Sequence, residues 1–144
     1  MYMKDGKKLL CSVLKTAQMG QVGIRSVLDT SMRPALRKAL EGQLREYDII
    51  ESEAHALAMQ RGWDLPELDP AVRFFSDRKM RMRLTRGNCD SKIADMMIRS
   101  NTLGMIRGLK DLHQYPKQYD RISGISQKLL DCETANIRQM QTFL

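Results

Sequence analysis

Residues 34–61 read PALRKALEGQLREYDIIESEAHALAMQR, and this stretch decides the fold. Proline opens it, where a helix accepts proline in its first turn, and Gly62 follows it as a stop signal. Its apolar residues recur at the three-and-four spacing of one helix face. The pattern predicts a helix over 34–61 whose inner stripe also carries polar groups. That stripe is Leu36, Leu40, Gln43, Tyr47, Ile50, Ala54, Leu57 and Ala58.

Three further long segments have the same pattern and predict helices over about 7–28, 90–113 and 117–143. Gly20 weakens the first of them or lets a neighbouring helix approach closely. The expected inner stripe of the 90–113 helix is Ile93, Met97, Asn101, Met105, Leu109 and Leu112. Polar residues again stand in the middle of the stripes, and they are Gln21, Asn101, Glu133 and Asn136.

The linkers between these segments predict the connectivity. A short turn joins the first two helices, so they should be antiparallel neighbours. About 25 residues separate the second helix from the third, and Asp69-Pro70 there predicts an extra helix over 70–86. Such a connection can travel the ~35–40 Å length of a bundle. We expect one all-α domain over 1–144, a four-helix bundle with a helical crossover. The alternative is one unbroken helix over 70–113.

Composition narrows the class of protein. The 144 residues carry a net charge of +7, which attracts anionic partners without specifying one. No apolar run approaches the ~20 residues that span a bilayer, and no secretory leader is visible. Cys11, Cys89 and Cys132 form no CxxC pair, so neither a zinc knuckle nor a disulfide framework is indicated. We expect reduced thiols and a cytoplasmic location.

Two segments resemble a known superfamily. Residues 90–98, DSKIADMMI, with Asn101, Leu103 and Gly104 after them, and residues 15–20, KTAQMG, are similar to ferritin-like and rubrerythrin-like bundles. The resemblance is closest to small ferritin-like proteins of clostridial bacteria, which implies a ferritin-like bundle of bacterial origin. Active members of the superfamily hold two iron or manganese ions. Their ligands are one Glu from each of two helices and Glu-x-x-His from each of the others.

This chain lacks that ligand set. Gln18 or Gln21 stands where the first helix would supply Glu, and Glu133 is followed three residues later by Asn136 instead of His. Neutral amides cannot compensate two buried dications. Two interpretations remain. One is a residual site for a single transition metal on Glu51, His55 and Glu133. The other, which we favour, is a core without a cofactor, closed by a polar network of Gln21, Gln43, Tyr47, Asn101 and Asn136.

The crossover segment is rich in cations. Its residues Arg73, Arg78, Lys79, Arg81, Arg83 and Arg86 form a candidate anion-binding surface for nucleic acid or lipid. The alternative is a solvated helix face that keeps the protein soluble. Apolar residues such as Phe74 and Met82 interleave with these cations, and they could lie on a membrane surface, or cover the bundle end or a second copy.

No arrangement of residues indicates catalysis. The three thiols have no histidine partner in sequence, and neither a phosphate-binding loop nor HExxH occurs. The leading hypothesis is therefore a non-enzymatic ferritin-like bundle that forms a homodimer or binds another protein. One alternative is a divergent metal-binding or oxidative-stress protein. A second is a nucleic-acid or anion binder that uses the Arg-rich segment 73–86.

Overall fold

The computed structural model describes residues 2–67, 90–115 and 120–144. These residues form four α-helices: α1 Tyr2–Leu28, α2 Pro34–Gln60, α4 Asp90–Gln114 and α5 Asp120–Gln141. All regular structure in these ranges is helical, which confirms the all-α bundle. Only α1 departs clearly from its predicted bounds, because it begins before Lys7. The predicted helix over 70–86 lies outside the described residues. None of the described helices has the length and hydropathy needed to cross a membrane.

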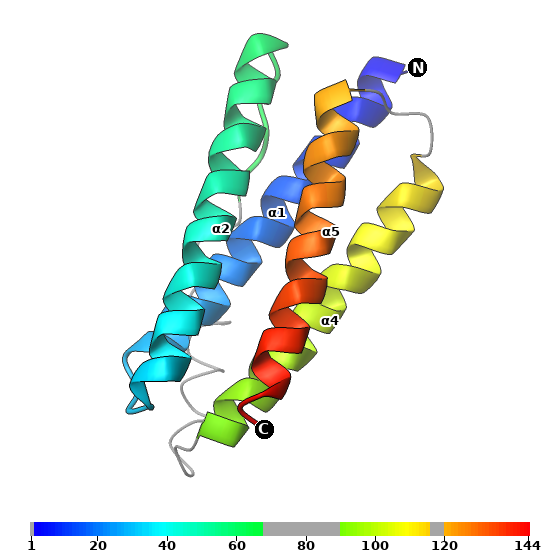
Figure 1. Ribbon diagram of the computed structural model, residues 1–144. Helices are drawn as coiled ribbons and strands as arrows, with labels where there is room; N and C mark the ends of the chain where they lie inside the picture. Colours follow the sequence, from blue (N-terminus) through cyan, green and yellow to red (C-terminus); the bar gives the residue numbers. More distant parts are fainter. Residues whose placement is uncertain (1, 68–89, 116–119) are drawn as a thin grey trace.

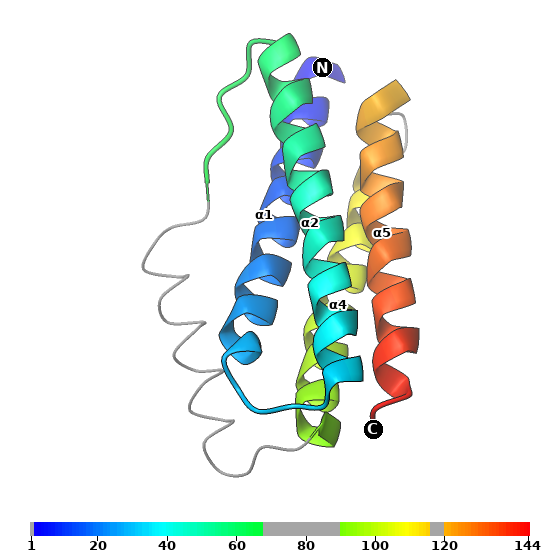
Figure 2. The ribbon, with the colours of Figure 1, turned by 60° about the vertical axis from the view of Figure 1, so that its left-hand side comes forward.

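The four helices form two antiparallel pairs, α1 with α2 and α4 with α5 (Figures 1 and 2). The first turns of α2 and α4 meet at one end of the bundle. There the backbone N–H of Arg33 donates to Asp90 Oδ1 at 3.2 Å, and Arg33 Nε lies 3.7 Å from Asp90 Oδ2. Helices α2 and α4 therefore run in the same direction, and the chain between them connects opposite ends of the bundle.

Local contacts explain where the first two helices end. The Arg37 guanidinium donates to the carbonyl oxygens of Leu28 at 2.7 Å and Thr30 at 3.0 Å, so it caps the last carbonyl of α1 and one carbonyl of the turn that follows. At the end of α2, Gly62 takes a φ of +68°, and the Trp63 N–H donates to Ala58 O at 2.9 Å. This is a glycine-terminated C-cap, as the sequence predicts.

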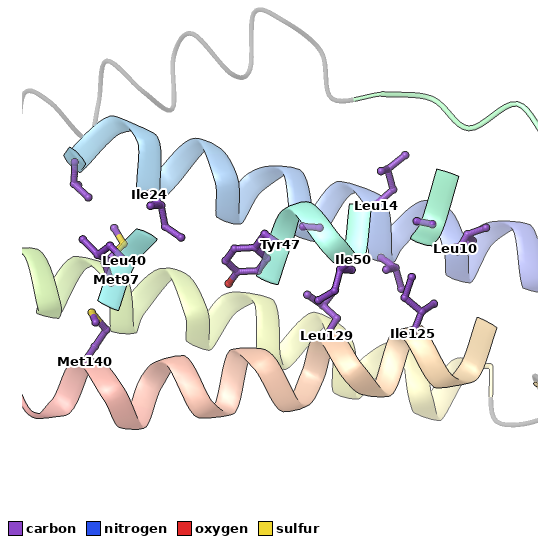
Figure 3. Packing of buried hydrophobic residues seen from close by; sticks show 14 of the residues in the cluster. Leu10, Leu14, Ile24, Leu40, Tyr47, Ile50, Met97, Ile125, Leu129 and Met140 are labelled. Carbon is purple, nitrogen blue, oxygen red and sulfur yellow. The ribbon is translucent and has the colours of Figure 1, made fainter. Parts of the chain in front are cut away.

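The core runs along the whole bundle axis (Figure 3). All eight residues of the predicted α2 stripe are buried, which confirms the periodicity that predicted this helix. Tyr47 lies near mid-length with its ring against α1, where a Cβ on Gly20 would come within 2.5 Å of the ring. Gly20 therefore permits the close approach expected from the sequence.

The predicted inner stripe of α4 is wrong at Leu109, and the other predicted residues after Asn101, Met105 and Leu112, are only partly buried. No later residue of this helix is buried, and Leu109 is 42% exposed. Gly104 and Gly108 occupy the inward positions instead. A Cβ on Gly104 would lie 2.7 Å from Glu133 Oε1, and one on Gly108 would lie 3.4 Å from Leu130 Cδ1. Because the glycines let α5 approach the backbone of α4, the larger apolar side chains of this half point sideways or outward.

Candidate functional site

A hydrogen-bonded triad joins three helices at the centre of the bundle. The Tyr47 hydroxyl from α2 donates to Asn101 Oδ1 from α4 at 3.0 Å. The same hydroxyl accepts from Asn136 Nδ2 from α5 at 3.3 Å. All three side chains are buried, so each hydrogen bond satisfies groups that water cannot reach. Burial and the nearby Glu133 carboxyl raise the pKa of Tyr47, so the phenol keeps its proton.

Glu133 lies beside this triad and is only 2% exposed. Its Oε2 atom has no hydrogen-bond partner within the described residues. Burial raises the pKa of Glu133 from 4.5 to about 8, against the lowering effects of a hydrogen bond with Tyr47 and the charge of Arg107. At neutral pH the side chain is therefore mostly a neutral carboxylic acid, which can both donate and accept a hydrogen bond.

A small pocket of about 100 Å³ opens between α1 and α4 above this acid. Tyr47 and Glu133 are its most deeply buried lining residues and form its floor. Arg107 stands at its mouth, where Nη1 donates to Thr16 Oγ1 at 3.3 Å. The other lining residues are Met19, Gly20, Ser100, Leu103 and Gly104. The pocket thus reaches from solvent to the buried Glu133 side chain.

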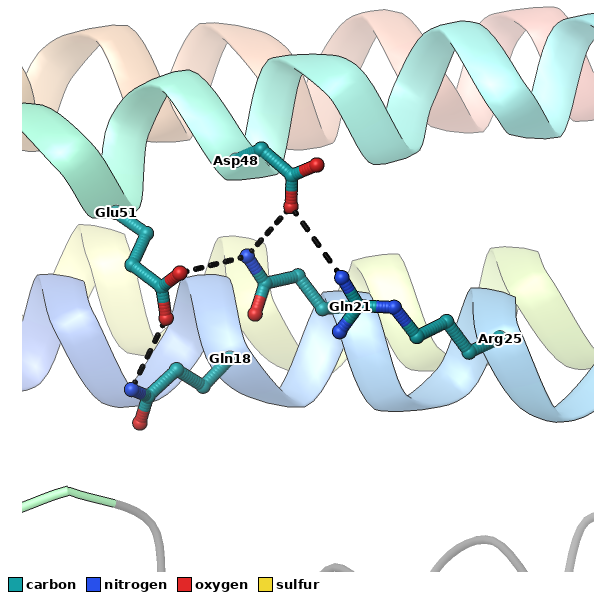
Figure 4. Close-up of polar contacts among 5 residues, drawn as sticks. All are labelled: Gln18, Gln21, Arg25, Asp48 and Glu51. Carbon is teal, nitrogen blue, oxygen red and sulfur yellow. Dashed lines mark hydrogen bonds and ion pairs between the residues drawn. The ribbon is translucent and has the colours of Figure 1, made fainter.

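The remaining members of the expected polar network are buried but lie in separate contacts. Gln43 Nε2 donates to Gln139 Oε1 at 2.8 Å, between α2 and α5. Gln21 Nε2 donates to Asp48 Oδ1 at 2.8 Å and to Glu51 Oε1 at 3.3 Å, between α1 and α2 (Figure 4). Only Tyr47, Asn101 and Asn136 of the five predicted residues are joined to one another directly.

The structure does not bring Glu51, His55 and Glu133 together. Glu51 faces α1, where it also accepts from Gln18 Nε2 at 3.1 Å (Figure 4). His55 is partly exposed, with Nε2 at 3.9 Å from Glu67 Oε1, while Glu133 faces Gly104 on α4. Across residues 2–67, 90–115 and 120–144, no three His, Cys, Asp or Glu side chains are grouped so that they could hold a metal ion.

The other predicted site lies outside the described residues. It is the anion-binding surface of Arg73, Arg78, Lys79, Arg81, Arg83 and Arg86.

Sequence reasoning missed the pocket and the role of Arg107. Glu133 stood on a predicted inner stripe, but only as a metal ligand or a network neighbour. The sequence did contain a signal for the pocket. Gly20 and Gly104 stand in the middle of two amphipathic helices, close to the polar stripe residues Gln21 and Asn101. Arg107 follows Gly104 by three residues, close to one helical turn, and so lies near it on the helix surface.

Comparisons of the chain with protein-family models, with curated proteins and with solved structures give no match.

Proposed function

We propose that this chain is a ferritin-like bundle that acts as a non-enzymatic association module, in which two copies pair through α4. The directions of the helices support the ferritin-like part of the proposal. Two antiparallel hairpins are joined by a connection between opposite ends of the bundle, as in ferritin-like folds. The triad of Tyr47, Asn101 and Asn136 supports a centre that needs no metal.

One observation carries the association. Three large apolar residues of α4 lie on its outer side, and we call them the α4 strip: Leu103, Ile106 and Leu109. Leu103 is 69% exposed and Ile106 is 42% exposed. Among the described residues no side chain of α4 beyond Asn101 is fully buried, so a second copy has an exposed apolar surface to cover here. A twofold axis near Ile106 would place the strip of one copy on that of another.

The charges around the α4 strip give this association a characteristic salt dependence. Arg107 and Lys110 are exposed beside the strip, so both copies would bring positive charge to the interface. Added sodium chloride screens that repulsion and leaves the apolar contact in place. A dimer built in this way should therefore tighten between 50 mM and 500 mM sodium chloride, whereas an ionic association would weaken.

Sedimentation equilibrium on the full chain tests the proposal. The protein should be dimeric at about 100 μM, and Ile106→Glu should weaken the dimer by at least about a hundredfold, because it brings a hydrated carboxylate into the centre of the apolar strip. The matched control is Ile49→Glu on α2, where the isoleucine is 45% exposed. This control should leave the dimer unchanged.

Two results would refute the association. One is a monomeric wild-type protein at about 100 μM, and the other is an equal loss of dimer in both variants.

Metal analysis of protein purified without a chelator tests the proposal that the bundle has no di-metal site. Two stoichiometric transition ions per chain would contradict a bundle without a di-metal site.

A further inference from the structure

The pocket above Glu133 has the geometry of a small binding site. Glu133 lies at its floor, and the buried Oε2 atom of this carboxyl group has no hydrogen-bond partner among the described residues. Buried polar atoms are nearly always hydrogen-bonded, so an unpaired oxygen beside an accessible space indicates that something else supplies the partner. Gly20 and Gly104 keep this space open, since each lies where a side chain would collide with Tyr47 or Glu133.

The charges of the pocket favour an anion. Arg107 is its charged lining residue at the mouth, and its neutral polar groups include the hydroxyls of Thr16, Ser100 and Tyr47. Glu133 is the one carboxyl group among the described lining residues, and in its neutral form it presents a hydrogen and does not repel an anion. Arg107, Thr16, Ser100 and the neutral Glu133 acid can therefore donate hydrogen bonds to a ligand, whereas the Tyr47 hydroxyl already donates its hydrogen to Asn101.

The size and the apolar surface restrict the anion further. A volume of about 100 Å³ is roughly that of three waters, using about 30 Å³ for each. Met19, Leu103 and the Tyr47 ring supply apolar walls. A short alkyl group would contact these walls, whereas phosphate, which has no alkyl group, would lose its hydration without that gain.

From this geometry we propose that the pocket binds a short-chain monocarboxylate such as acetate or propionate. The carboxylate lies between the Arg107 guanidinium and the Glu133 carboxyl group, and the alkyl group points toward Met19 and Leu103. The Glu133 acid donates its hydrogen to the ligand, and Arg107 provides the charge-assisted contact. All residues of this site come from one copy, so it does not require the dimer proposed above, although Leu103 and Arg107 also border the α4 strip.

The test is a titration of the ¹⁵N-labelled full chain with sodium acetate at pH 6.5, with sodium chloride held at matched ionic strength. The amide signals of Gly20 and Gly104 should shift and saturate with a Kd of about 1 mM, as small ligands bind weakly. Arg107→Met should raise the Kd at least about tenfold. The matched control is Arg99→Met on the same helix, where Arg99 pairs with Asp95 at 3.2 Å, and it should bind like wild type.

Two further variants and a second ligand test the individual parts of this proposal. Glu133→Gln retains a neutral donor and should bind within about threefold of wild type, while a folded Glu133→Gln protein that does not bind would overturn the role of Glu133. Phosphate should bind at least about tenfold more weakly than acetate, and equal binding would overturn the carboxylate assignment. Ile106→Glu should bind acetate like wild type even if dimerisation fails. Absence of saturation, or equal binding by Arg107→Met, would refute the site.

Discussion

The buried Glu133 should make the bundle less stable as the pH rises. Its pKa is about 8 in the folded chain, against 4.5 for the free side chain, so the folded state holds the proton more tightly than the unfolded state. The group therefore favours folding most below pH 4.5, and that advantage is lost as the pH rises toward 8. Since each tenfold change in proton affinity is worth about 1.4 kcal/mol, the full loss is about 5 kcal/mol.

Replacing Glu133 with Gln should remove this dependence, because Gln has nearly the same shape and stays neutral. Urea unfolding of both proteins, followed by circular dichroism at pH 5, 7 and 9, measures the difference. Relative to wild type, the free energy of unfolding of Glu133→Gln should rise by about 3 kcal/mol from pH 5 to pH 7. By pH 9 the rise from the pH 5 value should be about 4 kcal/mol, since about 1 kcal/mol of the full loss has already occurred by pH 5.

The control for this experiment is Glu53→Gln. Glu53 is exposed on α2 and pairs with Lys128 at 2.8 Å, so its replacement should change the stability by a similar small amount at all three pH values. A Glu133→Gln difference that stays constant from pH 5 to pH 9 would show that the carboxyl group is ionised and solvated in the folded protein. The reasoning about the buried acid would then be wrong.

Three other predictions concern the same region. Gly20→Ala should destabilise the protein by about 1–3 kcal/mol because its Cβ would meet the Tyr47 ring, whereas Gly42→Ala, with only the flexible end of Arg45 nearby, should stabilise it by about 0.5–1 kcal/mol. Urea unfolding compares the two, and equal effects would contradict the close packing at Gly20. Tyr47→Phe should cost about 1–3 kcal/mol in the same assay, since it leaves two buried amides without their shared partner. Burial, with the nearby Glu133, raises the pKa of Cys132 to about 12, so iodoacetamide at pH 8 should alkylate this thiol at least about a hundredfold more slowly in the folded protein than in urea. Peptide mass spectrometry would follow that reaction, and rapid labelling of the folded chain would show that the thiol is accessible.

The sequence predicts the helices well because their apolar periodicity is strong. In α2 the eight predicted stripe residues are the eight buried ones, since no glycine lies on the buried face and every inward position carries a side chain large enough to pack. The bounds of α2 follow from Pro34 and Gly62, whose backbone preferences act locally. Such features need no knowledge of the neighbouring helices.

The second half of α4 shows why the rest could not be predicted. The spacing of apolar residues predicted that Leu109 is buried. The inward positions are instead Gly104 and Gly108, and glycine has no apolar side chain that such a pattern could detect. The pocket was missed for a related reason. It depends on Arg107 of α4 and Glu133 of α5 meeting across a gap, and that distance is set by packing between helices and not by the local sequence.

The glycine at position 104 also limits how this sequence can change. Any side chain added there must displace the Glu133 carboxyl group or move the whole helix, because that carboxyl group already lies where the first side-chain atom would go. The same holds for Gly20 and the Tyr47 ring. Positions 104 and 133, and positions 20 and 47, should therefore covary: a mutant library selected for folding should accept an enlargement at one member of a pair only together with a reduction at the other.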